Sequence, residues 1–166
     1  MLPRVARSCP TPLNPSEKRS RQHRAAQIAR ALGFVGRVEY AHIYSQTGGA
    51  QYGQGSNVAQ DVLIVYAEAF DRDADPDDFS LRAIIAHERG HQLLARHPRL
   101  SQRVEGIAIG TEEILASVLG AVLCGDDADG DSLISKAMLE LLQHGESPDV
   151  AVRRLQSLSN LFKAAL

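Results

Sequence analysis

The sequence predicts an α+β fold, in which an N-terminal helix and a small antiparallel or mixed sheet pack on a central helix and a helical part follows. Two observations predict this order. Strand-like patterns occupy the region between residues 37 and 67, whereas the chain on either side shows helical spacing of apolar residues. Polar–proline pairs, which favour helix starts, occur at residues 14–15, 75–76 and 147–148.

The length and composition indicate one domain. The chain has 166 residues, of which 44% are hydrophobic, and this is enough for a single core. We expect a flexible segment over residues 1–13 and one domain over residues 14–166. The formal net charge of −2 gives no general attraction to nucleic acid or to an anionic membrane. A nucleic-acid partner is therefore not expected.

The sequence shows no membrane segment and no secretory signal. A run of about 18 apolar residues does not occur, and the N-terminal stretch lacks an apolar region. The two cysteines, Cys9 and Cys124, are too few for a disulfide scaffold and fit a reducing compartment. These features predict a cytoplasmic protein without a membrane partner.

Caps and prolines predict the boundaries of the first two helices. The first helix is expected from Pro15 to Leu32, with Glu17 in the position of a capping-box carboxylate and Gly33 as the stop. The central helix is expected from Pro76 to about Arg96, because a proline follows at position 98.

Two strands are expected between these helices. Residue types alternate from Val38 to Ile43, and the run from Val62 to Tyr66 is continuously apolar and rich in β-branched residues. We interpret the two as a hairpin. The connection from Thr47 to Asn57 contains four glycines and is expected to be a mobile loop.

Three further helices are expected over residues 111–123, capped by Thr111, and over residues 132–143 and 148–165. The acidic stretch 126–131 looks like a calcium loop. With Gly130 at the glycine position of such a loop, however, Gly125 and Lys136 fall where ligands are required. We therefore expect an acidic surface loop.

The central helix carries an HExxH pentapeptide, His87-Glu88-Arg89-Gly90-His91. This spacing puts both imidazoles on one helix face, one turn apart, where two nitrogens can bind one tetrahedral Zn²⁺. Glu88 lies beside the first histidine and can act on a metal-bound water as a general base. The pentapeptide therefore predicts a metal-dependent hydrolase.

A catalytic zinc site uses three protein ligands, and the chain offers two candidates for the third. His97 stands where the metzincin pattern HExxHxxGxxH places its third histidine, but Leu94 replaces the glycine at which that chain leaves its helix. Glu113 is expected in the first turn of the next helix, from which a carboxylate can reach a metal between two antiparallel helices. We favour Glu113, and His97 stays open as the alternative.

Glu113 begins the run Glu-Ile-Leu-Ala, and together with the HExxH it resembles the gluzincin metallopeptidases, whose second helix carries the third ligand in an ExxA[D] pattern. The ImmA/IrrE branch and the prenyl-protease and heat-shock-protease branch are similar in these motifs. The resemblance covers about residues 63–123, and Ser117 stands where an aspartate commonly follows the alanine.

The resemblance implies a zincin-like fold and a zinc metallopeptidase. It also implies a zinc ion held by His87, His91 and Glu113, and a peptide or protein substrate. The catalytic residue is then Glu88, which activates a zinc-bound water for hydrolysis of the peptide bond. With His97 as third ligand, the protein is instead a metzincin-like protease.

A hypothesis of another class is a binding or regulatory module built on the basic first helix. The basic residues of that helix are Lys18, Arg19, Arg21, Arg24 and Arg30. Such charges also fit a solvated helix face, and no aromatic platform for nucleic acid accompanies them. The metalloprotease is therefore the favoured hypothesis.

Overall fold

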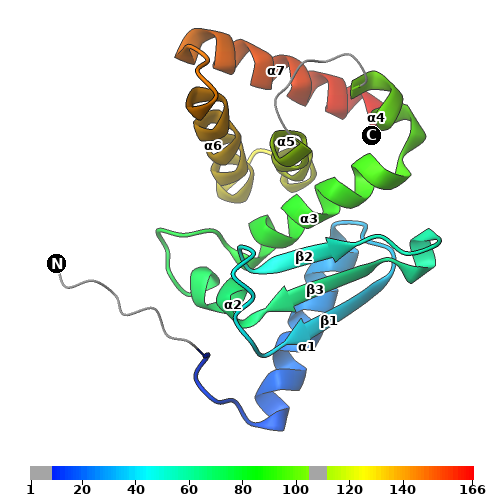
Figure 1. The fold of residues 1–166 in the computed structure, drawn as a ribbon, viewed down its shortest axis with the longest axis vertical. Coiled ribbons are helices and arrows are strands. Elements are labelled where there is room, and N and C mark those ends of the chain that lie inside the picture. Colours follow the sequence, from blue (N-terminus) through cyan, green and yellow to red (C-terminus); the bar gives the residue numbers. More distant parts are fainter. Residues whose placement is uncertain (1–8, 105–111) are drawn as a thin grey trace, which may run out of the picture.

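The computed structural model describes residues 9–104 and 112–166, which form an α+β arrangement with a small mixed sheet (Figure 1). The elements are α1 (Pro15–Ala31), β1 (Arg37–Ala41), β2 (Ala50–Gly53), a 3-10 turn η1 (Val58–Gln60), β3 (Val62–Tyr66), α2 (Ala67–Asp73), α3 (Leu81–Arg96), α4 (Pro98–Val104), α5 (Glu112–Cys124), α6 (Ala128–Gln143) and α7 (Pro148–Ala165). Most of the predicted segment 1–13, and the predicted cap Thr111, lie outside the described residues.

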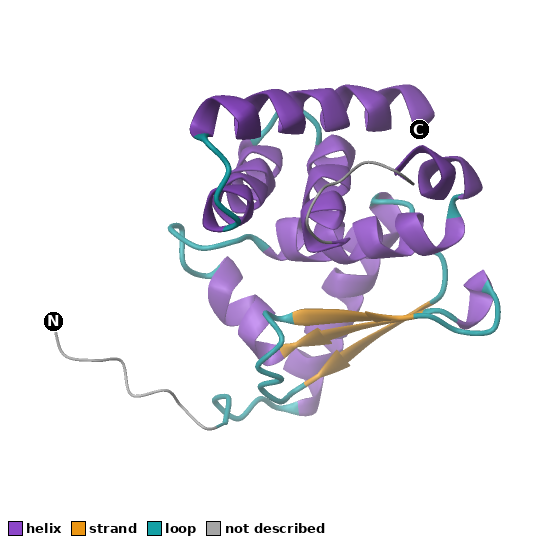
Figure 2. Cartoon of the chain, turned by 45° about the horizontal axis from the view of Figure 1, so that its top comes forward, coloured by secondary structure: helices purple, strands orange, loops and turns teal. Residues whose placement is uncertain are grey.

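Helix α3 lies between the sheet and the C-terminal helices, as Figures 1 and 2 both show. One group of buried side chains, which includes Leu63 and Ile85, joins the sheet to α1 and α3. A second group, which includes Leu93 and Phe162, joins α3 to α5, α6 and α7. Because α3 contributes to both groups, its position is fixed from two sides.

The predicted hairpin is wrong. The run Val62–Tyr66 is the central strand β3, which pairs in parallel with β1 and antiparallel with β2, giving the order β1-β3-β2. A parallel pair needs a long crossover, so β1 and β3 cannot be joined by a turn. The connection over residues 47–57, predicted as a mobile loop, instead contains β2, and the turn η1 follows it before β3.

Close backbone approach explains two of the glycines in that stretch. A Cβ on Gly49, which has φ +118°, would lie 3.1 Å from Ala69, and one on Gly55 would overlap the carbonyl of Gln60. The preceding turn is held from α2, because Glu68 accepts hydrogen bonds from the backbone N–H and the hydroxyl of Ser45. These glycines therefore serve packing against α2 and η1.

The predicted first helix is confirmed. The Asn14 side chain accepts from the backbone N–H of Glu17 at 2.8 Å, and the Glu17 carboxylate accepts from the N–H of Asn14, also at 2.8 Å. These two bonds form the expected capping box. The helix ends at Ala31 with Leu32 as its C-cap, and Gly33 follows with φ +81°.

The predicted start of the central helix at Pro76 is wrong. Helix α3 begins at Leu81, where the Ser80 side chain accepts from the N–H of Ala83, and a separate short helix, α2, precedes it. Asp73, the last residue of α2, accepts from the N–H of Leu81 at 2.8 Å and so caps the first turn of α3. Between the two helices, Asp75 accepts from the N–H of Asp77 at 3.0 Å within a turn. The C-terminal end before Pro98 is as predicted.

The C-terminal helices follow the prediction except at one start. Helix α7 begins at Pro148 after Ser147, as expected, whereas α6 begins at Ala128 because the Asp127 side chain accepts from the N–H of Gly130. The acidic stretch predicted as a surface loop is therefore partly the first turn of α6. None of the described helices is both long and apolar enough to cross a bilayer.

A buried carboxylate ties α3 to the sheet. Asp61, which is 0% exposed, accepts from Arg96 at 2.6 Å, Gln92 at 2.9 Å, the Tyr52 hydroxyl at 2.8 Å and the N–H of Gly55 at 2.8 Å. Burial raises the pKa of Asp61, but these hydrogen bonds outweigh it and hold the pKa well below its usual range. Burial and this carboxylate raise the pKa of Tyr52 to about 12, so its phenol stays a donor.

We expect Asp61→Asn to lower the free energy of unfolding by about 2–4 kcal/mol at pH 7, because an amide cannot accept from all of these donors. The pKa of Asp61 is lower in the folded protein than in the unfolded chain, where it is about 3.9, so the ionised carboxylate stabilises the fold at any pH above that value. This stabilisation is lost as the pH falls below about 3.9 and through the folded pKa. Urea unfolding of wild type and Asp61→Asn should therefore show a difference in the free energy of unfolding at pH 7 that becomes smaller at about pH 3.

The matched control is Asp126→Asn, at an exposed position, for which little change is expected. Equal stabilities of wild type and Asp61→Asn at pH 7 would contradict the assigned role of the buried carboxylate.

Candidate metal centre

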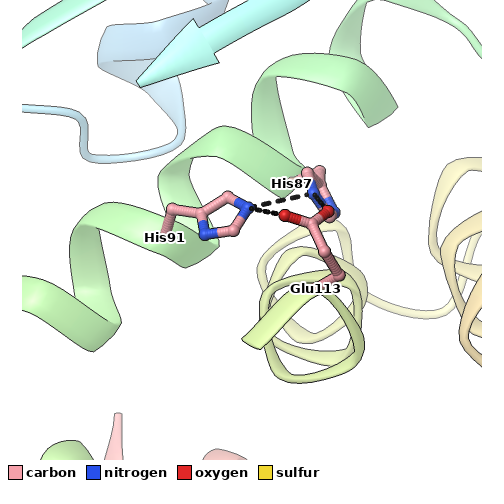
Figure 3. Close-up of side chains that lie close together, drawn as sticks. All are labelled: His87, His91 and Glu113. Carbon is pink, nitrogen blue, oxygen red and sulfur yellow. Dashed lines mark hydrogen bonds and ion pairs between the residues drawn. The ribbon is translucent and has the colours of Figure 1, made fainter. Parts of the chain in front are cut away.

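Three side chains that can ligate a metal converge between α3 and α5. His87 and His91 project from successive turns of α3 towards Glu113, in the first turn of α5 (Figure 3). The distance from His87 Nε2 to Glu113 Oε2 is 2.9 Å, that from His91 Nε2 to Glu113 Oε1 is 3.1 Å, and the two Nε2 atoms are 3.2 Å apart. The structure thus brings together the three residues that the sequence suggested as ligands.

Two glycines let α5 approach α3 closely enough for this. A Cβ on Gly90, inside the HExxH, would overlap the carbonyl oxygen of Ala116, and a Cβ on Gly120 would lie 2.9 Å from Ala86. Both contacts are between helix backbones, which cannot move aside as side chains can. The close packing therefore places the first turn of α5 within reach of both imidazoles.

The remaining nitrogen of each imidazole also has a partner. His87 Nδ1 lies 3.0 Å from the buried hydroxyl of Ser117, and His91 Nδ1 lies 3.0 Å from Glu112 Oε1. An ionised carboxylate only accepts, so His91 Nδ1 donates to Glu112. Partners of this kind fix the ring orientation and direct Nε2 towards a metal. Ser117, which departs from the gluzincin pattern, thus contacts the ring that an aspartate would be expected to support.

The protonation states suit metal binding. The hydrogen bond from His87 and the charges of both rings lower the pKa of Glu113 to about 2, with partial burial opposing them. Burial lowers the pKa of His87, and the hydrogen bond to Glu113 offsets part of this. A carboxylate and a neutral imidazole are the forms that bind a metal.

The short contacts fit a cation better than protons. With Glu113 ionised, its contacts to the two Nε2 atoms each require an N–H, and these N–H groups would then face each other across 3.2 Å. A metal ion among the three side chains instead accepts a lone pair from each. The separations of 2.9–3.2 Å are near the roughly 3.3 Å between ligand atoms of a tetrahedral ion with bonds of about 2.0–2.1 Å. These residues could therefore hold a metal.

Glu88 lies against the sheet and is not one of the three converging side chains, His87, His91 and Glu113. Its Oε2 accepts from the backbone N–H of Tyr52 in β2 at 2.9 Å. Burial raises the pKa of Glu88 to about 7, although the charge of His91 and the Tyr52 hydrogen bond act in the opposite direction. The edge of the sheet thus fixes the orientation of the carboxylate that the sequence predicted as a general base.

A cavity of about 520 Å³ lies over His87, His91 and Glu113. One wall is β2 with the turn before it, and the floor is the face of α3 that carries His87, Glu88 and His91. The opposite wall comes from the start of α5 and from Leu133 and Lys136 of α6. The three candidate ligands and the candidate base therefore face one solvent-accessible space.

His97, the alternative ligand, lies elsewhere. It is the C-cap of α3, with an extended backbone and with its N–H bonded to Leu93 at 2.8 Å. Because α3 continues through Leu94 to Arg96, the chain does not turn back towards His91 as the metzincin pattern requires. Within residues 9–104 and 112–166, the group of potential ligands contains His87, His91 and Glu113 and does not contain His97.

Two of the basic residues of the first helix are engaged within the chain. Arg21 donates to the Tyr40 hydroxyl at 2.9 Å, and Arg24 pairs with Asp73 at 2.9 Å. These contacts attach α1 to the sheet and to the end of α2, and they do not favour the binding-module hypothesis.

Sequence reasoning did not identify Glu112 or the Tyr52 N–H as parts of the site. Glu112 carried a usable signal, because it adjoins the favoured ligand in the same helical turn. The sequence gives no signal for the Tyr52 contact, because this contact uses a backbone N–H whose direction depends on how β2 pairs.

No protein-family model matches this chain, no curated protein matches its sequence, and no solved structure matches it. The resemblance to gluzincins therefore rests on the HExxH, on Glu113 and on the geometry that brings them together.

We expect Ser117→Ala to weaken the affinity for Zn²⁺ by about 10–100-fold, because His87 loses the partner that orients it. Chelator competition on the refolded or native protein measures this. Ser157→Ala, at an exposed position of α7, is the matched control. An unchanged affinity in Ser117→Ala would show that the hydroxyl does not support the ligand.

Proposed function

We propose that the protein is a zinc-dependent metallopeptidase of gluzincin type. The observation that carries the proposal is the convergence of His87, His91 and Glu113 on one point, with Glu88 beside it in the same cavity. Two imidazoles and a carboxylate form a donor set typical of catalytic zinc, which keeps a fourth position open.

Zinc in this site would polarise the scissile carbonyl and lower the pKa of water. The residues of the chain do the rest. Glu88 takes a proton from the attacking water and returns it to the leaving amine, a role that requires a fixed carboxylate beside the ligands. Its hydrogen bond to Tyr52 supports this role, because the bond holds the carboxylate in place.

The outer edge of β2 is suited to align an extended peptide. The Tyr52 N–H points away from β3, since it donates to Glu88, whereas the Gly49 carbonyl faces β3 and accepts from Tyr66 at 2.8 Å. Backbone groups alternate along a strand, so the backbone groups of Ala50 and the carbonyl of Tyr52 also lie on the outer side, where they can bond to a peptide while the Tyr52 N–H stays with Glu88. A peptide lying along this edge would pass over the ligand group, which supports a peptide or protein as substrate.

We expect Glu88→Gln to keep stoichiometric zinc and to lose peptide cleavage by about 10²–10⁴-fold, because an amide cannot take the proton. Zinc analysis together with cleavage of a broad peptide library measures both quantities. The matched control, Glu39→Gln on β1, should change neither. Equal cleavage by Glu88→Gln and wild type would remove Glu88 from the mechanism, and a wild type that holds zinc but cleaves no peptide would refute the peptidase.

A further inference from the structure

Lys136 brings a positive charge to the candidate metal centre from a separate helix. It lies on α6 and lines the same cavity as His87, Glu88 and His91. Its Nζ lies 3.8 Å from Glu113 Oε2 and 3.3 Å from Glu140 Oε1, and its side chain is 32% exposed. The ammonium group therefore stands beside the point on which the ligands converge.

Neither distance is that of a strong ion-pair hydrogen bond, which is about 2.7–2.9 Å. Glu113 lies 2.9 and 3.1 Å from the two imidazole Nε2 atoms, so contacts other than Lys136 hold it in position. Lys136 is thus held near the site by two carboxylates while its donors remain able to turn towards a molecule in the cavity.

Two other donors that line the cavity, Arg72 and the Tyr52 hydroxyl, are committed to the fold. Arg72 donates to Asp78 at 2.9 Å and to the carbonyl of Gly48 at 2.6 Å. The Tyr52 hydroxyl donates to Asp61. Among the described lining residues, Lys136 is therefore the basic side chain, apart from the two histidines, that is best placed to meet a negative charge near Glu113.

We propose that Lys136 stabilises the oxyanion formed when water adds to the scissile carbonyl, and this inference rests on the proposed peptidase function. The water oxygen bonds to the carbonyl carbon, the electron pair of the C=O bond moves to its oxygen, and Glu88 takes the water proton. On collapse the C=O bond re-forms, the C–N bond breaks, and the amine receives that proton. Lys136 donates to the oxygen while it carries the negative charge.

Lys136 lies close enough to act on a charge at the candidate ligands. Its Nζ is 3.8 Å from Glu113 Oε2, and its side chain lines the same cavity as His87, Glu88 and His91. An ammonium at this distance can act on a negatively charged oxygen between the ligands and the base. Because Glu88 belongs to α3 and Lys136 to α6, base and cation reach the cavity from different helices.

A purely structural role makes a different prediction. If Lys136 only positioned Glu113, its loss would weaken zinc binding. If it acts on the oxyanion, its loss removes a cation that repels Zn²⁺, so the zinc affinity stays within about threefold or rises. Zinc affinity therefore separates the two roles independently of activity.

The test compares Lys136→Met and Lys136→Arg with Lys163→Met, an exposed position on α7, as the matched control. The probe is N-phosphoryl-leucyl-tryptophan, which carries a tetrahedral anion, with its Kd measured by calorimetry on the zinc-loaded proteins. We expect Lys136→Met to bind the probe about 10–100-fold more weakly. Its kcat on library peptides should fall about 10²–10³-fold with KM nearly unchanged, and Lys136→Arg should recover part of both losses.

Equal probe affinity in wild type and Lys136→Met, or a loss that parallels weaker zinc binding, would overturn the role of Lys136. No binding of the probe to the zinc-loaded wild type would overturn it as well. If the wild type cleaves peptides and Lys136→Met does so equally fast, the peptidase stands and the inference falls. A wild type without stoichiometric zinc refutes the proposed function itself, and the inference with it.

Discussion

The close contact between the backbones of α3 and α5 is the constraint on which the site depends. Gly90 and Gly120 leave no room for a Cβ, so the backbones of the two helices are in direct contact where the HExxH passes α5. Any side chain at either position would push α5 away and carry Glu113 with it. The middle residues of the pentapeptide are unspecified in the motif, yet in this chain Gly90 sets the distance between α3 and Glu113, the candidate third ligand.

Polar contacts then fix directions that packing leaves open. Ser117 and Glu112 orient the two imidazoles, and both come from the helix that supplies Glu113. On the sheet side of α3, Asp61 accepts from Arg96, the last residue of α3, and from the Tyr52 hydroxyl. The backbone N–H of Tyr52 in turn donates to Glu88. The buried network around Asp61 and the candidate base are thus parts of one connected structure.

The sequence predicted the features that depend on local residue patterns, but it did not predict how the strands pair. The spacing of His87 and His91, and the missing glycine at Leu94, correctly indicated an uninterrupted helix with both imidazoles on one face. The hairpin prediction was wrong because β2 has only four residues and is flanked by glycines, so that its pairing with β3 depends on tertiary contacts. The place of Lys136 depends on how α6 packs on α5, which no local pattern records.

We propose that Glu113, rather than His97, completes a metal site with His87 and His91. Zinc per chain, measured by mass spectrometry after dialysis against metal-free buffer, tests this directly in wild type, Glu113→Ala and His97→Ala. We expect about one zinc ion per chain in wild type and His97→Ala, and little in Glu113→Ala, because two imidazoles alone hold zinc weakly. Zinc retained by Glu113→Ala and lost by His97→Ala would contradict it.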